Sequence, residues 1–269
     1  MKALVLQMRG LDDPSREVER AQYLKYTGLS ELEVDFVDLY EQDDWNPQSL
    51  QDYNVLFIGG ISRDEAEELS WPEEKFPFIQ NLRSGMQLAI DQKIPSLLSC
   101  GGFVIAGDML GGETLAKLEN HELGVIGIQK SPEAERDVFL APVSSILPIV
   151  CGHIKYFDKA PPGTDLLYYS DTYEPGIPLQ AFKVRGAPFY AFQGHPEISS
   201  SDLFDRIKPM MYRKHYFPKR KGHPEDEIYS YNHEAFLHAS SIKKDTSEAQ
   251  ALLKRFVGLV KEGAFEQEN

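Results

Sequence analysis

The chain has 269 residues, 42% of them hydrophobic, so it can bury a core as one large domain or two small ones. Its formal net charge of -14 argues against a nucleic-acid backbone or an anionic membrane surface as the main partner, and leaves small molecules or proteins. Two cysteines are too few for a disulfide scaffold. The low cysteine count is compatible with a reducing, cytoplasmic compartment. No apolar stretch approaches the roughly 20 residues that span a bilayer, so we expect a soluble protein.

Strand-like and helix-like segments alternate through the first half of the chain. This alternation predicts an α/β fold with an open, mostly parallel twisted sheet and helices on both faces. Apolar, β-capable runs predict strands at Lys2–Gln7, Glu33–Leu39, Asn54–Ile58 and Pro95–Ser99. Apolar residues at helical spacing predict helices at Pro14–Leu29, Ile79–Gln92 and Phe103–Leu110.

From Glu122 onward, strand-like runs are separated by Pro/Gly turns, which predicts a mixed or antiparallel extension of the sheet. The runs are ELGVIGIQK, SSILPIV, DLLYYS, LQAFKV and PFYAFQ. The last part has helical spacing again, at Ser201–Tyr212 and Thr246–Glu262. We therefore predict one domain over residues 1–200, with a helical C-terminal extension over 201–269 that packs on the same domain.

Cys100 joins a predicted buried strand to a predicted helix in the stretch SLLSCGG. Its sulfur is expected at the carboxyl end of a parallel strand, where open α/β sheets bind ligands. The two glycines that follow allow a sharp turn and a close approach of substrate. The positive end of the helix favours a thiolate at this position. The alternative is a small buried residue in a Gly-rich turn, and Cys151, which has no comparable turn, is expected to be structural.

Backbone amides close to Cys100 are candidates for binding an oxyanion. The N–H of Gly101 is placed to donate to such a charge, and one donor of this kind can be worth roughly 3 kcal/mol in a transition state. Gly59 and Gly60, at the end of the neighbouring predicted strand, offer a second donor.

The tetrapeptide Gly-His-Pro-Glu occurs twice, at 194–197 and at 222–225. Residues two apart in an extended chain share a face, so the carboxylate can orient the imidazole while the other ring nitrogen faces a nucleophile. The first copy follows the strand-like run PFYAFQ, which predicts a rigid catalytic pair of His195 and Glu197. The second follows PKRK in a charged stretch and is predicted to be a surface loop. No metal-ligand spacing links His121, His215, His233 and His238, so no metal site is predicted.

Several of these motifs occur in an order that resembles a known family. Gly59-Gly60 at a strand end, SCGG with Gly111-Gly112 behind it, the segment CGHIKYFDKAPPGTDLLYYS, and LQAFKVRGAPFYAFQGHPE follow one another between Lys2 and Ser199. Together they are similar to the class I glutamine amidotransferases, particularly the amidotransferase domain of GMP synthase and its stand-alone relatives. The resemblance implies a flavodoxin-like sheet.

The resemblance also implies site residues and chemistry. Cys100 would be the nucleophile, His195 the base and then the acid, and Glu197 the residue that orients His195. Gly59, Gly60, Gly101 and His153 would bind the oxyanion or the substrate. The reaction would cleave a γ-glutamyl amide, of glutamine or of another γ-glutamyl compound or peptide, through a γ-glutamyl thioester on Cys100, with no cofactor.

Three departures from the family pattern bear on function. Val104 stands where the family has a substrate-holding glutamine, Ser99 replaces the glycine before the cysteine, and Ile61 replaces a proline. Two alternatives stay open beside the hydrolase, of which the departures motivate the second. One is an ammonia-supplying glutaminase subunit of a separate synthase, and the other is a catalytically degenerate binding protein. A basic stretch, YRKHYFPKRKG at 212–222, is a solvated loop or a contact for an acidic partner.

Overall fold

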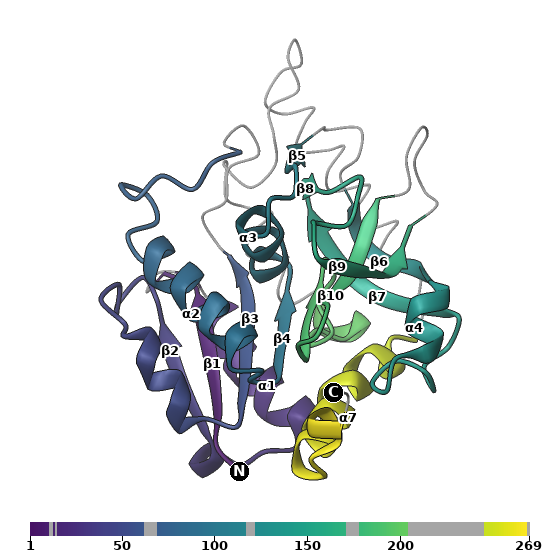
Figure 1. The fold of residues 1–269 in the computed structure, drawn as a ribbon, viewed down its shortest axis with the longest axis horizontal. Helices are drawn as coiled ribbons and strands as arrows, with labels where there is room; N and C mark the ends of the chain where they lie inside the picture. The colour runs from purple at the N-terminus through teal and green to yellow at the C-terminus, as the bar shows by residue number, and fades with distance from the viewer. Residues whose placement is uncertain are drawn as a thin grey trace.

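A large mixed sheet forms the centre of the computed structural model, which describes residues 1–10, 13, 15–61, 69–116, 122–170, 178–203 and 245–267. Within these residues the sheet has nine strands in the order β2-β1-β3-β4-β11-β10-β9-β6-β7 (Figure 1). The strands are β1 (Ala3–Met8), β2 (Val34–Asp38), β3 (Val55–Ile61), β4 (Ser96–Ser99), β6 (Glu122–Lys130), β7 (Ile146–His153), β9 (Thr164–Tyr169), β10 (Leu179–Val184) and β11 (Phe189–Phe192). A separate pair, β5 (Leu115–Ala116) and β8 (Lys155–Tyr156), forms a small second sheet.

The sheet has a parallel half and an antiparallel half. Strands β2, β1, β3, β4 and β11 run parallel to one another. From β11 onward, β10, β9, β6 and β7 alternate in direction. The predicted fold class, a mostly parallel sheet with a mixed extension, is confirmed. The last strand in sequence, β11, lies between β4 and β10, so it joins the two halves.

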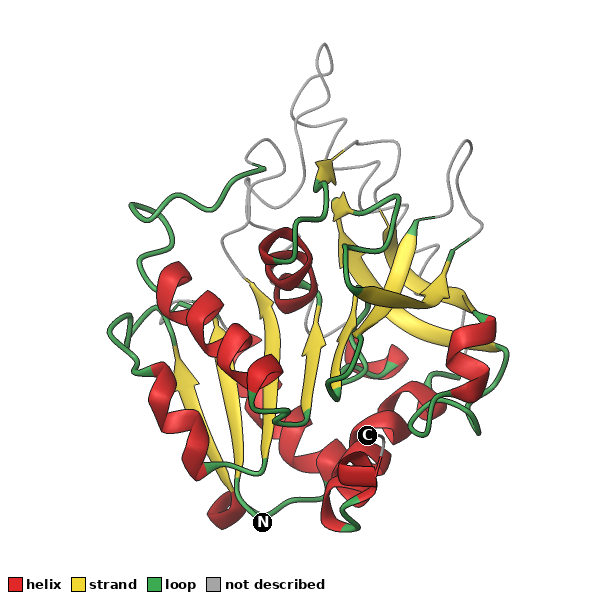
Figure 2. Cartoon of the chain, in the orientation of Figure 1, coloured by secondary structure: helices red, strands yellow, loops and turns green. Residues whose placement is uncertain are grey.

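Helices cover both faces of the parallel half (Figure 2). Leu4 and Leu6 of β1 face a core shared with α2 (Ile79–Asp91) and α3 (Gly101–Met109). The alternate residues of β1 face a second core, shared with α1 (Ser15–Thr27) and α7 (Ser247–Lys261). This two-residue alternation is the expected consequence of burying a strand on both faces. In the described part of the chain, no helix combines the length and apolar character needed to cross a bilayer.

The C-terminal helix α7 belongs to the layer that covers the sheet. Its Phe256 ring lies 6.3 Å from that of Phe57 on β3, 5.1 Å from that of Phe139 and 5.7 Å from that of Tyr190 on β11. The helix therefore packs across the strands next to the centre of the sheet. The division of the chain at residue 200 stays a prediction, because residues 204–244 lie outside the described part.

The predicted elements agree with the observed ones except at a few places. β3 continues through both glycines to Ile61, three residues beyond the predicted end. Helix α3 begins at Gly101, directly after Cys100. A short helix, α4 (Pro132–Arg136), was not predicted, because five residues are too few to show helical spacing. Of the helix predicted at Ser201–Tyr212, only the first three residues are described, and they are helical.

Candidate functional site

Cys100 lies on a sharp turn between β4 and α3, with its side chain partly exposed. Its backbone has φ 46 and ψ -100, a conformation that side chains rarely adopt and that costs roughly 1–3 kcal/mol. Neighbouring elements hold it there. The Cys100 N–H donates to the Phe192 carbonyl of β11 at 2.9 Å, and the Cys100 carbonyl accepts from the Val104 N–H at 3.0 Å. Such a strained turn presents a nucleophile at the top of a parallel sheet.

The glycines after Cys100 let helix α3 approach the end of β3 closely. A Cβ on Gly101 would lie 2.8 Å from the Ile61 backbone nitrogen, and a Cβ on Gly102 would lie 3.1 Å from the Ile58 carbonyl oxygen. There is no room for a side chain at the first position. The elbow at Cys100 and the carboxyl end of β3 are therefore in direct contact, as the sequence motif predicts.

Gly59 and Gly60 form a β-bulge at that end of β3. The pairing of β1 with β3 passes from Leu6 opposite Ile58 to Met8 opposite Ile61, so Gln7 alone faces both glycines. On the other side of β3, pairing with β4 ends at Ile58. A bulge leaves an extra residue outside the ladder and re-aims the backbone, and bulges are frequent beside active sites. The two glycines thus lie beyond the β3–β4 ladder, just before Ile61, which packs against Gly101.

His195 and Glu197 lie in a turn that follows β11. The His195 Nδ1 is 2.6 Å from Glu197 Oε1, and the two residues are 7% and 0% exposed. The His195 N–H donates to the Val150 carbonyl of β7 at 2.7 Å, which anchors the turn to the antiparallel half of the sheet. The Cys100 side chain interacts with the same ring, and this interaction is one cause of the raised pKa of His195.

The surroundings of His195 favour its protonated form. Burial of the ring opposes protonation, but the negative charges of Glu197 and Cys100, together with hydrogen bonds to both, raise the pKa of His195 to about 9. The structure thus brings together the three residues that the sequence analysis selected for a catalytic role.

His153 makes a second buried pair, with Glu122. Its Nε2 is 2.8 Å from Glu122 Oε2, and its Nδ1 is 3.1 Å from the Lys155 carbonyl oxygen. A carbonyl can only accept, so Nδ1 carries a proton. Gln180 and Ser170 also donate to the Glu122 carboxylate, at 2.7 and 3.2 Å. Both ring nitrogens of His153 therefore have partners within the protein, and its predicted contact with substrate stays a proposal.

One cluster of possible metal ligands occurs among the described residues. Ligand atoms of Glu122, Cys151 and His153 lie within 4.8 Å of one another, and all three residues are buried. However, Glu122 and His153 already bond each other directly. Burial and the nearby charges of Glu122 and Cys100 raise the pKa of Cys151, so it remains a neutral thiol and a poor metal ligand. The cluster fits a hydrogen-bonded core better than a metal site.

The three residues that depart from the family pattern are Val104, Ile61 and Ser99, and they lie in different surroundings. Val104 is 3% exposed and belongs to the hydrophobic core on the α3 side of the sheet. Ile61 ends β3 and contacts Gly101, and Ser99 is the buried last residue of β4. Val104 thus offers no polar group where the family places an amide.

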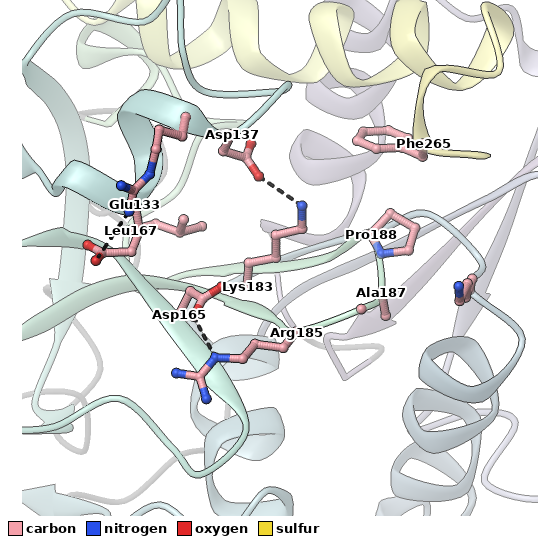
Figure 3. A pocket seen from close by; sticks show the side chains of 12 residues that line it. Glu133, Asp137, Asp165, Leu167, Lys183, Arg185, Ala187, Pro188 and Phe265 are labelled. Carbon is pink, nitrogen blue, oxygen red and sulfur yellow. Dashed lines mark hydrogen bonds and ion pairs between the residues drawn. The ribbon is translucent and has the colours of Figure 1, made fainter. Parts of the chain in front are cut away.

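A separate hollow is lined by residues of α4, β9 and β10, among others (Figure 3). It has a volume of about 490 Å³ and lies beside Pro188, before the start of β11, whereas His195 follows the other end of that strand. Its charged groups are largely paired: Lys183 contacts Asp137 at 2.9 Å and Arg185 contacts Asp165 at 2.6 Å. This hollow is not part of the Cys100 site.

Other predictions fall outside the described residues. These are the second Gly-His-Pro-Glu copy at 222–225, the basic stretch at 212–222, and His121, His215, His233 and His238.

Comparison with known proteins shows that the chain has the fold of solved glutamine amidotransferase structures. No protein-family model matches the sequence, and neither does any curated protein.

Solved structures match it over nearly the whole chain. A putative GMP synthase subunit from Thermoplasma acidophilum is 14% identical with a TM-score of 0.63, covering 100% of this chain and 98% of that one. A glutamine amidotransferase from Thermotoga maritima is 16% identical with a TM-score of 0.60, covering 95% and 98%. The glutaminase domain of Trypanosoma brucei CTPS with bound acivicin is 15% identical, with a TM-score of 0.55 and coverage of 91% and 95%.

Proposed function

We propose that this protein is a cysteine hydrolase of the amidotransferase type that cleaves a γ-glutamyl amide. The observation that supports this most directly is the chain of contacts from Cys100 through His195 to Glu197, at a strained elbow beside a glycine bulge. Nucleophile, base and orienting carboxylate within hydrogen-bonding reach are the arrangement that covalent acyl transfer needs.

The reaction takes place in two halves. The Cys100 thiolate attacks the side-chain carbonyl carbon, and the C–S bond forms as the carbonyl oxygen takes up negative charge. The backbone amides of the Gly59-Gly60 bulge and of Gly101 stabilise that charge. The imidazolium of His195 gives its proton to the nitrogen, the C–N bond breaks and ammonia or an amine leaves. Water then attacks the thioester with His195 as base, which releases the acid and restores Cys100. No cofactor or metal is required.

The substrate class is inferred from Val104 of α3. Because Val104 is apolar and buried, the family's amide contact to substrate has no counterpart at this position. A site that lacks a hydrogen-bonding group no longer favours the substrate that would bond to that group over other substrates. A γ-glutamyl compound larger than glutamine, or a peptide, gains binding from its leaving group instead. His153 would contribute through its ring edge or backbone.

The test is a substrate panel. The purified protein is incubated with glutamine and with a series of γ-glutamyl amides and peptides, and release of ammonia or amine is measured for the wild type and for Cys100→Ala. We expect release that depends on Cys100, with at least one γ-glutamyl peptide turned over faster than glutamine. Failure of every member of the panel, together with failure of a chloroketone analogue of glutamine to label Cys100, would exclude the proposal.

The raised pKa of His195 predicts an alkaline limit to activity. The ring keeps its proton through neutral pH and loses it as the pH rises through about 9, so kcat/KM should fall above that value. Glu197→Gln removes the largest charge that raises the pKa of His195, and the limit should then move to lower pH. Measuring kcat/KM against pH for both proteins checks this. An alkaline limb that stays in place in Glu197→Gln would contradict the assigned role of Glu197.

A second candidate function has support from the comparisons. The neighbours from Thermoplasma acidophilum and Trypanosoma brucei carry the names of synthase parts, and each match covers nearly all of this chain. An ammonia-supplying subunit should show little glutaminase activity alone and strong stimulation by a synthase. Affinity purification from its natural host, followed by glutaminase assays of any complex, separates this function from a stand-alone hydrolase. A cytoplasmic location remains a prediction under both functions.

A further inference from the structure

A buried ion pair lies directly beneath the glycine bulge. Arg9 follows β1, and its Nε and Nη2 contact Glu19 Oε2 of α1 at 3.0 and 2.8 Å. The two side chains are 3% and 0% exposed. Gln7 donates to the other Glu19 oxygen at 3.0 Å, and Asp13 lies 4.0 Å from Arg9 Nη1. Buried ion pairs contribute little net stability, because desolvation offsets their attraction, so stability alone does not account for this one.

The ion pair contacts both glycines of the bulge. A Cβ on Gly59 would lie 2.8 Å from Glu19 Oε1, and a Cβ on Gly60 would lie 2.6 Å from Arg9 Nη2. Consecutive residues of a regular strand point to opposite faces, but the bulge turns both positions toward the pair. The absence of side chains at both positions therefore lets the bulge backbone lie directly on the ion pair.

Gly60 connects the ion pair to His195. The Cβ position of Gly60 is 2.9 Å from His195 Cε1 and 2.6 Å from Arg9 Nη2, so the guanidinium and the imidazole approach one another across Gly60. Among the described residues, Glu197 at Nδ1 and the Cys100 side chain also act on the ring. Glu19 neutralises Arg9. The pair therefore places a rigid guanidinium beside the imidazole of His195 without adding a net positive charge.

We infer that Arg9 and Glu19 are positioning residues of the reaction centre: their ion pair supports the Gly59-Gly60 bulge and balances the charge beside His195. The inference rests on the proposed function in one respect, since the bulge acts as an oxyanion donor only if an acyl group is transferred. A shift of about 1 Å in such a donor can cost roughly 10²-fold in rate. The balance of charge beside His195 is a property of the folded protein, whatever its substrate.

The test uses two substitutions that remove opposite charges. Arg9→Gln leaves the carboxylates of Glu19 and Asp13 unbalanced near His195, and Glu19→Gln leaves the guanidinium unbalanced. The ring is followed by NMR of the protein with ¹³C-labelled histidine. We expect the pKa of His195 to rise in Arg9→Gln and to fall in Glu19→Gln, each by about one pH unit. In turnover assays, kcat should fall about tenfold or more in both while KM changes little.

Arg16→Gln on the same helix is the matched control. Arg16 also makes a two-bond contact with a carboxylate, Glu41, at 2.6 and 2.7 Å, but none of its atoms is among the three nearest to the Cβ position of either glycine. It should leave kcat and the titration of His195 unchanged. Arg9→Lys restores the charge without the planar two-bond contact, so it should return the pKa of His195 toward the wild-type value while kcat stays low.

The outcomes separate this inference from the proposed function. Shifts of the His195 pKa in the same direction in both variants, or no shift, would overturn the inference even if the wild type hydrolyses its substrate. Opposite shifts in a protein without hydrolase activity would remove the proposed function and keep the charge balance. If the single variants do not fold, the neutral double variant Arg9→Gln/Glu19→Gln decides, because wild-type kcat in it would refute the positioning role.

Discussion

Replacing His195 with alanine is expected to lower kcat/KM for Cys100-dependent hydrolysis by about 10³-fold or more. The imidazole contacts both the Cys100 side chain and a buried carboxylate, so its loss removes the thiolate's counter-charge and the proton donor together. Labelling of Cys100 by a chloroketone analogue of glutamine should slow in parallel. Steady-state kinetics and mass spectrometry of the labelled protein measure the two effects.

Two comparisons decide whether the loss belongs to one catalytic unit. The double variant Cys100→Ala/His195→Ala should be no less active than Cys100→Ala alone, because residues that act together are not additive. His223→Ala changes the histidine of the second Gly-His-Pro-Glu copy and should retain nearly full activity. Equal losses in His195→Ala and His223→Ala, at equal thermal stability, would overturn the assignment of His195.

Local sequence was enough to predict the elbow and the His195–Glu197 pair. Cys100 follows a short apolar run and precedes two glycines, and a strand-to-helix turn needs no distant information. His195 and Glu197 are two residues apart, so the extended backbone alone places both side chains together. The resemblance to a family then linked two motifs that lie almost a hundred residues apart.

The supporting contacts could not be predicted in the same way. Arg9 and Glu19 come from different elements, and their pairing depends on how α1 lies over β1. Glu122 meets His153 through the register of the β6–β7 hairpin, across 31 residues. The glycine bulge depends on a shift of register between β1 and β3. Each of these features is set by pairing between elements, which hydrophobic periodicity does not encode.

The position of β11 determines where His195 lies. A strand near residue 190 was predicted, but its insertion between β4 and β10 was not. Parallel pairing of Phe192 with Ser99 puts the end of β11 beside the residue before Cys100. The turn after β11 then carries His195 to the elbow, while the Val150 carbonyl holds it from the other side. The two halves of the sheet thus meet at the His195–Glu197 pair.

Gly60→Ala adds a single methyl group and is expected to damage the site severely. The new methyl group would fall 2.6 Å from Arg9 Nη2 and 2.9 Å from His195 Cε1, closer than atoms can approach. Relief requires the bulge or the imidazole to move, and displacement of an oxyanion donor or a base costs about 10²-fold or more. We expect kcat to fall by that factor, with a loss of about 1–3 kcal/mol in the free energy of unfolding measured by urea titration.

Gly258→Ala is the matched control, since Gly258 lies within α7 and a Cβ there would have no heavy atom within 4 Å. Alanine is the better helix former by about 1 kcal/mol, so this variant should be slightly more stable and fully active. Arg9→Ala/Gly60→Ala then distinguishes the two contacts of the new methyl group. If the clash with Arg9 displaces the bulge, removing the guanidinium relieves the clash. The double variant should then have a higher kcat than Gly60→Ala, closer to that of Arg9→Ala. If the clash with His195 dominates, kcat stays at the level of Gly60→Ala, and the imidazole is the group that Gly60 has to accommodate.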